Sequence, residues 1–337
     1  MNTQPIPVVL VAGYLGSGKT TLVNHLLTHA RDHRIGVVVN DFGRVNVDAL
    51  AVAGQIDAML PVGNGCLCCA VDSAGLDRML ERLTEPALGI DAIVVEASGL
   101  AEPRDLVRML LAGENPRIAY GGLVEVVDAV EFEANRIRHP ELDEHLRFAD
   151  LVVLNKTDQR DDEDLRELVR ELSGGRPVVR ASFGAIDPGL LFDPGRPEPV
   201  ARQLSFDDLR HQDGHLGHPH AHLHDAYRSV EFSSATPLHP RRLLNFLTER
   251  PAGLYRMKGP VHFGVPGHDD RFLLHTVGPY LRFHRSPWGD EAPGTRLVLI
   301  GTGLDADDLL ARLSACVEPV PAARTERAIL PVLKHCG

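Results

Sequence analysis

The sequence predicts an α/β protein with a doubly wound, mostly parallel sheet, followed by a second, smaller α+β domain. Three observations lead to this prediction. Apolar runs of strand length alternate with amphipathic segments from residue 1 to about 190. A break rich in Pro and Gly covers 187–199, and the pattern changes to a different mixture of strands and helices from about residue 228. A length of 337 residues is also typical of two domains.

The expected strands of the first domain are short apolar runs. Between them, the segment 20–30 places Leu22, Val23, Leu26 and Leu27 at helical spacing. In a doubly wound sheet, ligands bind at the carboxyl ends of the strands, so the residues that follow these runs are the first site candidates. The expected strands lie near 6–12, 35–40, 91–96, 121–128, 150–155 and 177–181.

Residues 13–20 read GYLGSGKT, which matches the phosphate-binding pattern G-x-x-x-x-G-K-[ST] between a strand and a helix. Glycines let backbone N–H groups turn toward phosphate oxygens, and the helix start adds its positive end. Lys19 is expected to reach the terminal phosphates, and Thr20 to ligate Mg²⁺. The alternative, a Gly-rich turn that happens to contain lysine, leaves the matching flanks unexplained. The candidate residues are Gly13, Gly16, Ser17, Gly18, Lys19, Thr20 and Thr21.

The apolar run at 91–96 ends in Glu96 and continues into a turn of small residues that includes Gly99. An acidic residue at the end of a strand beside a phosphate loop is placed to hold Mg²⁺ or its water. Gly99 is expected to offer its N–H to the γ-phosphate. An ordinary acidic strand end is the alternative, which the phosphate loop disfavours.

The motif NKTD at 155–158 ends a further apolar strand and indicates which nucleotide binds. Asp158 can accept hydrogen bonds from N1–H and the exocyclic amine of guanine, an arrangement that adenine does not offer. Asn155 and the stem of Lys156 are expected to shape the base slot, and Ser182 to complete it. The motif therefore favours GTP over ATP.

Three thiols cluster at Cys66, Cys68 and Cys69, in the sequence GCLCC. In a reducing compartment, clustered cysteines indicate metal or redox chemistry. Soft sulfur ligands select Zn²⁺ or Cu⁺, with Co²⁺ and Ni²⁺ also accepted, and three protein ligands leave one exchangeable position. The alternative is three small core residues, which the flanking glycines disfavour.

Six histidines crowd a stretch at 211–225 that also contains Gly, Pro and Asp. Short His-rich tracts are typical of metal binding, and neutral imidazoles suit Zn²⁺, Co²⁺, Ni²⁺ and Cu²⁺. A polar linker with incidental histidines is the alternative. We expect a flexible linker over 191–227 that binds zinc loosely. The histidines are His211, His215, His218, His220, His222 and His224.

Residues 228–320 predict the smaller α+β domain. Helices are expected over 239–250 and 305–317, the second one capped by Asp305. The remainder, 321–337, is expected to be a frayed tail, with His335 and Cys336 as weak metal-ligand candidates. The expected strands lie in 228–234, 253–263, 271–285 and 295–301.

The composition argues against several classes of partner. A net charge of −11 disfavours both nucleic acid and anionic membranes. No apolar run reaches the length of a membrane span. Five cysteines, an odd number, and the lack of a signal-peptide pattern favour the cytoplasm over a disulfide-bonded exterior.

Together these motifs resemble the CobW-like family of P-loop GTPases, which act as metallochaperones and metal-insertion factors. The chain carries GYLGSGKTTL, VVNDFGRVNVD (38–48), GCLCC, VVEASGLAEP, VVDAV (126–130) and LNKTD in that family's order. GLYRMKG (253–259) and the segment 296–313 resemble its C-terminal domain. The resemblance implies that Mg²⁺-GTP binds at Gly13 to Thr20 and that the cysteine motif carries the transferred metal.

One segment departs from the family pattern. Members often show N-E-F-G-E after the second strand, and this chain has NDFGR at 40–44. Asp41 keeps a carboxylate that is one methylene shorter, and is expected to act in catalysis with Lys19 and Glu96. Arg44 replaces the second acid. If that acid helps to bind metal in relatives, this chain has lost the ligand. Arg44 itself is expected to contact either phosphate or solvent.

The sequence thus predicts a cytoplasmic GTPase that passes a transition metal, zinc in the first place, to a client metalloprotein. GTP and Mg²⁺ would order the segments around Asp41 and Cys66. Hydrolysis of GTP would then let these segments lose that order, and the metal would be released. One alternative is a cobalt or iron insertion factor for a cobalamin pathway or a metalloenzyme. Another is a non-catalytic zinc buffer that GTP gates. NKTD disfavours a kinase, and a homodimer is left open.

Overall fold

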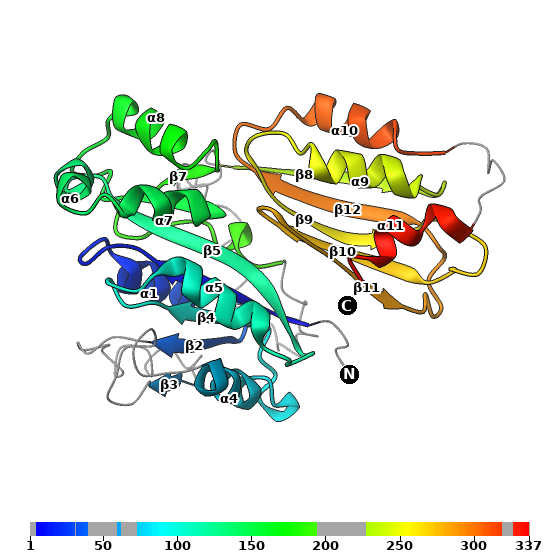
Figure 1. The fold of residues 1–337 in the computed structure, drawn as a ribbon, viewed down its shortest axis with the longest axis horizontal. Coiled ribbons are helices and arrows are strands. Elements are labelled where there is room, and N and C mark those ends of the chain that lie inside the picture. Colours follow the sequence, from blue (N-terminus) through cyan, green and yellow to red (C-terminus); the bar gives the residue numbers. More distant parts are fainter. Residues whose placement is uncertain are drawn as a thin grey trace, which may run out of the picture.

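The computed structural model describes residues 5–30, 32–39, 59–61, 73–193, 227–318 and 326–336. Its first domain is built on a seven-stranded parallel sheet with the strand order β3-β2-β4-β1-β5-β6-β7 (Figure 1). The six predicted strands are present, and β3 is an additional edge strand that was not predicted from the sequence. The strands are β1 (Ile6–Ala12), β2 (Ile35–Val39), β3 (Met59–Pro61), β4 (Ala92–Glu96), β5 (Ile118–Asp128), β6 (Leu151–Asn155) and β7 (Val178–Arg180).

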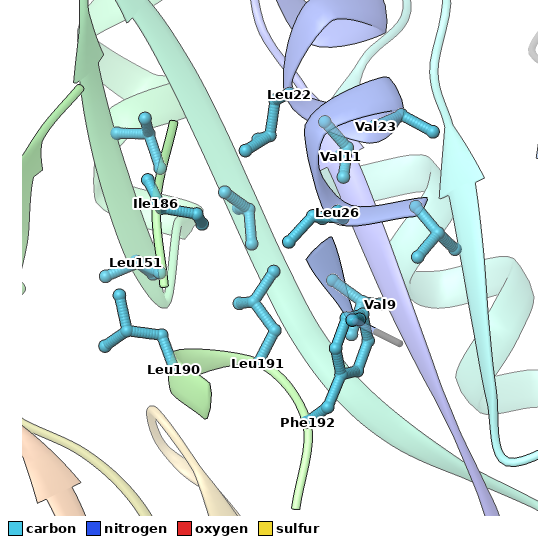
Figure 2. Close-up of a cluster of buried hydrophobic side chains, with 14 of the residues drawn as sticks. Val9, Val11, Leu22, Val23, Leu26, Leu151, Ile186, Leu190, Leu191 and Phe192 are labelled. Atoms are coloured by element: carbon cyan, nitrogen blue, oxygen red, sulfur yellow. The ribbon is translucent and has the colours of Figure 1, made fainter. Parts of the chain in front are cut away.

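Helices cover both faces of this sheet, because alternate residues of each buried strand face opposite sides. Val9 and Val11 of β1 pack against Leu22 and Leu26 of the first helix, in the cluster that Figure 2 shows. The other helices contribute to cores on the opposite face, the short α6 through Phe132 alone. The helices are α1 (Lys19–His29), α4 (Ser73–Leu83), α5 (Pro103–Ala112), α6 (Phe132–Arg138), α7 (Leu142–Phe148) and α8 (Glu163–Leu172).

The second domain has a five-stranded antiparallel sheet with the order β11-β10-β9-β12-β8, and helices on one of its faces (Figure 1). The Asp305 carboxylate accepts hydrogen bonds from the N–H groups of Asp307 and Asp308, which confirms the predicted cap. The elements are β8 (Arg228–Ser234), α9 (Pro240–Thr248), β9 (Leu254–Val261), β10 (Arg271–Val277), β11 (Tyr280–Ser286), β12 (Thr295–Gly301), α10 (Ala306–Ser314) and α11 (Leu330–Leu333).

The two domains pack against each other through a buried interface. Tyr255, Val277 and Ile300 of the second sheet enter the hydrophobic core beside α1. His275 of β10 forms a 2.8 Å hydrogen bond through Nε2 to the carbonyl oxygen of Tyr120 on β5. Burial lowers the pKa of His275 to about 4, so this side chain is neutral and acts as a fixed part of the interface.

The chain end differs from the frayed tail expected from the sequence. Residues 326–336 fold onto the second domain, where Ile329 and Val332 are fully buried. The Phe283 N–H donates a 2.8 Å hydrogen bond to the carbonyl oxygen of His335. Two apolar residues at helical spacing are enough to cover the edge of the second core, which outweighs the Pro- and Ala-rich composition nearby.

Candidate active site

The loop between β1 and α1 is held in a conformation that requires glycine. Gly13, Gly16 and Gly18 have φ angles of 146°, 77° and 101°. A Cβ on Gly13 would lie 2.4 Å from the carbonyl oxygen of Val126, and one on Gly18 would lie 2.2 Å from Nδ2 of Asn155. The loop therefore sits directly on β5 and β6, with no room for side chains at these two positions.

Lys19 begins α1 and turns its ammonium group back over this loop. Its Nζ donates hydrogen bonds to the carbonyl oxygens of Gly13, at 2.9 Å, and Tyr14, at 3.2 Å. Lys19 is only 8% exposed to solvent. A cation fixed at the start of a helix, beside backbone N–H groups, is the arrangement that binds phosphate.

A hydroxyl and a carboxylate meet at the next position. The Thr20 Oγ1 donates a 2.6 Å hydrogen bond to Oε1 of Glu96. Glu96 ends β4 and lies in parallel register with Val11, so the sheet itself places it beside the loop. Glu96 is 2% exposed. Hydroxyl and carboxylate oxygens are the ligands that Mg²⁺ prefers, so this pair fits that ion.

Gly99 follows β4 and lies against the same loop. A Cβ at Gly99 would lie 2.6 Å from Cδ2 and 2.9 Å from the backbone nitrogen of Leu15. Thr21, the other loop candidate, is exposed on α1. The structure thus brings together the candidates from β1, α1 and β4 at the carboxyl edge of the sheet.

The NKTD residues adjoin the loop from the other side. Asn155 is 2% exposed; its Nδ2 donates to the carbonyl oxygen of Ser17 and its Oδ1 accepts from the N–H of Gly184, both at 2.9 Å. Lys156 has a φ of 64°, and its Nζ lies 2.5 Å from Oδ2 of Asp128. The carboxylate of Asp158 is exposed.

Ser182 belongs to the same group. The Oγ1 of Thr157 donates a 2.9 Å hydrogen bond to the carbonyl oxygen of Ala181 and lies 3.2 Å from Oγ of Ser182. The loops after β6 and β7 are therefore joined. Phe183, the next residue, has a φ of 53° and is 72% exposed. Phe183 was not among the candidates predicted from the sequence.

Two acids of β5 were also missed as site residues. Asp128 pairs with Lys156, and Glu125 is buried beneath the loop, in register with Ala12. A cavity of about 20 Å³ adjoins Glu125, Ser17 and Tyr14. Among the described residues, Oε2 of Glu125 and Oγ of Ser17 have no hydrogen-bond partner. The signal available in the sequence was two acids in the otherwise apolar run LVEVVD.

Comparison with known proteins identifies the family of this chain. The model described as "CobW/HypB/UreG, nucleotide-binding domain" matches residues 7–180, which is more than half of the chain. The chain belongs to this family. The model described as "Cobalamin synthesis protein cobW C-terminal domain" matches residues 227–317 of the same CobW-family chain.

Two curated relatives match over most of their length. The "Zinc chaperone CobW" of Pseudomonas aeruginosa is 32% identical over 355 residues, covering 89% of this chain and 88% of the relative. The "Zinc chaperone YjiA" of Escherichia coli is 29% identical over 320 residues, covering 91% and 98%. The solved structure "Zn(II)-bound YjiA GTPase from E. coli" aligns with a TM-score of 0.45 at 25% identity, covering 94% of this chain and 100% of that one.

The remaining candidates of this CobW-family chain lie outside the described residues. These are Asp41 and Arg44, the thiols Cys66, Cys68 and Cys69, and the histidines between 211 and 224. Within the part of the chain that the structure describes, no three His, Cys, Asp or Glu residues group as a metal site. In that same part, no helix is both long and apolar enough to cross a membrane.

Proposed function

We propose that this chain is a GTPase that binds a transition metal, zinc in the first place, and transfers it to a client metalloprotein. The main observation in support of GTP binding is that hydrogen bonds connect the segment from the phosphate loop into α1 with the strands on both sides of it. Thr20 of α1 is bonded to Glu96 of β4, and Ser17 is bonded to Asn155 of β6. A phosphate-binding loop, an acidic strand end and a base-reading motif thereby form one continuous site.

Each residue has a role that its position supports. Lys19 would neutralise the terminal phosphates, while the N–H groups of the loop and of Gly99 would donate hydrogen bonds to the phosphate oxygens. Thr20 and Glu96 would hold Mg²⁺, which supplies charge stabilisation when bound. Asp41 would complete the catalytic group from the segment after β2.

The base would lie between the loops after β6 and β7. Asp158 would accept from guanine, Lys156 would lie along the ring, and Asn155 and Ser182 would hold the two loops in place. The bonds from Asn155 to Ser17 and Gly184 support this assignment, because one buried amide fixes the phosphate loop and the base loop together.

The proposal of metal binding and transfer rests on the ligand chemistry of the cysteines and histidines and on the names of related proteins. Curated relatives that match most of this chain are named zinc chaperones. Three clustered thiolates at Cys66, Cys68 and Cys69 are soft ligands that suit Zn²⁺ and accept Co²⁺. The histidines of 211–224 would raise the total zinc capacity without a fixed geometry. The handover to a client implies that the thiol site keeps an exchangeable position.

A two-part experiment tests the proposal. Phosphate release from Mg²⁺-GTP should be abolished in Lys19→Ala and unchanged in Lys334→Ala, which removes an exposed lysine of the second domain. Cobalt substitution of the wild type should give an intense sulfur-to-metal charge-transfer band. Replacing Cys66, Cys68 and Cys69 with Ser should remove the band and spare GTP binding, and Cys336→Ser should leave the band intact.

The outcomes separate this function from its rivals. Equal phosphate release from Lys19→Ala and wild type would place hydrolysis elsewhere. A charge-transfer band that survives the triple Ser variant would make the thiols structural. Tight zinc binding with no GTP turnover, even with a client present, would favour a buffer over a chaperone.

A further inference from the structure

A second cleft lies between the two domains, at the opposite edge of the parallel sheet from the phosphate loop. Its volume is about 550 Å³. One wall is the loop 174–177, which precedes β7 and therefore lies at the amino ends of the strands. The other wall comes from the second domain, from the loop after α9 and the β10–β11 turn. A nucleotide at the carboxyl ends of the strands would leave this cleft free.

The cleft is cationic in a chain whose net charge is −11. Arg176 lines it from the first domain, and Arg250 and His335 line it from the second. Among the described residues that form its lining there is no Asp or Glu. Burial, and then the neighbouring charge of Arg176, lower the pKa of Arg250. Two guanidinium groups that repel each other this way are stabilised by an anion between them.

Arg250 is oriented rather than loose. Its Nε donates a 2.7 Å hydrogen bond to the carbonyl oxygen of Leu247, which fixes the plane of the guanidinium group. Its Nη1 is buried and has no acceptor among the described residues. A buried guanidinium nitrogen without an acceptor is costly, so the position calls for an oxygen ligand.

The nearest acid does not fill this place. Asp150 lies under the cleft and attracts both arginines, but its Oδ2 already accepts from the Tyr120 hydroxyl and the Leu123 N–H. Burial raises the pKa of Asp150 to about 6, so its carboxylate is largely ionised at neutral pH, but among the described residues it forms no hydrogen bond or ion pair with either arginine.

Several backbone N–H groups around the cleft are already used within the protein. The N–H groups of Gly174 and Gly175 donate to the carbonyl oxygens of Glu171 and Arg170, and the Gly278 N–H donates to that of Tyr255. The guanidinium groups of Arg176 and Arg250 are the charged donors that line the cleft. No heavy atom lies within 4 Å of a Cβ placed on Gly174 or Gly175, so this wall is open to a ligand.

We propose that this cleft binds a small organic molecule that carries a phosphomonoester group, with Arg176 and Arg250 sharing the phosphate oxygens. Three terminal oxygens and a double negative charge suit two guanidinium forks from different domains better than a single carboxylate does. The volume lies within the range of about 300–1,000 Å³ typical of small-molecule sites. Because each domain supplies one arginine, the bound molecule stabilises the domain arrangement.

The test uses the full chain saturated with Mg²⁺ and a non-hydrolysable GTP analogue, so that the phosphate loop, its γ-phosphate position included, does not compete for the probe. Inorganic phosphate is titrated by calorimetry, with acetate as the monoanionic comparison. Wild type should bind phosphate saturably and bind acetate more weakly. Arg176→Ala and Arg250→Gln should each raise the phosphate Kd by about tenfold or more, the loss expected for a charge-assisted pair. Arg241→Ala, an exposed arginine on α9, should bind like wild type.

Three results would overturn the proposal: no saturable phosphate binding to the wild type loaded with the GTP analogue, an unchanged Kd in Arg176→Ala, or acetate binding as tightly as phosphate. Thermal unfolding checks the fold of each variant. If Arg250→Gln is unfolded, Arg176→Ala alone decides, because Arg176 is only half-buried and its side chain forms no hydrogen bond or ion pair with the rest of the described chain. Phosphate should also raise the melting temperature of wild type but not of Arg176→Ala.

Discussion

The side-chain amide of Asn155 donates a 2.9 Å hydrogen bond to the backbone carbonyl of Ser17, so the end of β6 holds the phosphate loop in place. The same amide accepts from the Gly184 N–H after β7. One residue of the NKTD motif therefore connects two loops that are separated by more than 160 residues. This gives Asn155 a structural role before any nucleotide is bound.

Asn155→Ala should lower the free energy of unfolding and weaken GTP binding together. The substitution leaves a buried carbonyl at Ser17 and a buried N–H at Gly184 without partners, at a cost of about 1–3 kcal/mol. Urea denaturation and a GTP titration measure the two effects. Asn245→Ala, an exposed asparagine on α9, is the control. Full stability in Asn155→Ala would mean that the amide bridge contributes nothing.

Asp158→Asn should change which nucleotide binds. Wild type should prefer GTP to ATP, because a carboxylate can accept from two donors on guanine that adenine lacks. The asparagine variant should lose discrimination against xanthosine nucleotides, whose base presents an acceptor in place of the amine. Calorimetric titrations of GTP, ATP and XTP measure this. Asp161→Asn, which removes an exposed acid paired with Arg180, should keep the wild-type order. Equal affinity of wild type for GTP and ATP would refute the guanine assignment.

Thr20→Ala should raise the Mg²⁺ concentration needed for half-maximal GTP hydrolysis. The hydroxyl bonded to Glu96 is one of the two oxygen groups that fit Mg²⁺, and its removal also leaves the buried Glu96 with one donor fewer. The matched control is Thr28→Ala on the same helix, whose hydroxyl bonds only to the Asn24 carbonyl on the surface. An unchanged magnesium requirement in Thr20→Ala would remove Thr20 from the ion's ligands.

The sequence predicted more of the nucleotide site than of the contacts between the two domains. Short-range patterns were sufficient for the loop 13–20 and for Glu96, because a strand, a turn and a helix are adjacent in the chain. The partners of Asn155 lie in the loops that follow β1 and β7, and only the folded sheet brings Ser17 and Gly184 to it. Arg176 and Arg250 belong to different domains and matched no motif, so nothing in the sequence linked them.

The chain end shows a different limit. Its Pro- and Ala-rich composition predicted a frayed tail, but the structure buries Ile329 and Val332 in the second core. The free energy of burying two apolar side chains depends on a surface built by residues far away in sequence. Composition of the tail alone does not contain that information.

Glu125→Gln should remove a pH dependence of stability between about pH 4.5 and 8. Glu125 is 3% exposed, and burial raises its pKa from 4.5 to about 8, with the charge of Lys19 opposing the shift and that of Glu102 adding to it. The folded state keeps a proton that the unfolded state releases above pH 4.5. Stability from this residue is therefore complete below pH 4.5 and is lost as the pH rises toward 8, at up to about 1.4 kcal/mol per pH unit.

Glutamine stays neutral, so the variant should lack this slope and gain stability over wild type as the pH increases. Urea denaturation at a series of pH values measures the difference between the two proteins, in which other titrating groups such as His275 and Asp150 cancel. Glu131→Gln, an exposed acid that follows β5, should show the wild-type slope. A constant difference between Glu125→Gln and wild type from pH 5 to 8.5 would mean that Glu125 is ionised in the folded protein, and that the carboxylate beneath the phosphate loop is balanced by Lys19 despite its burial.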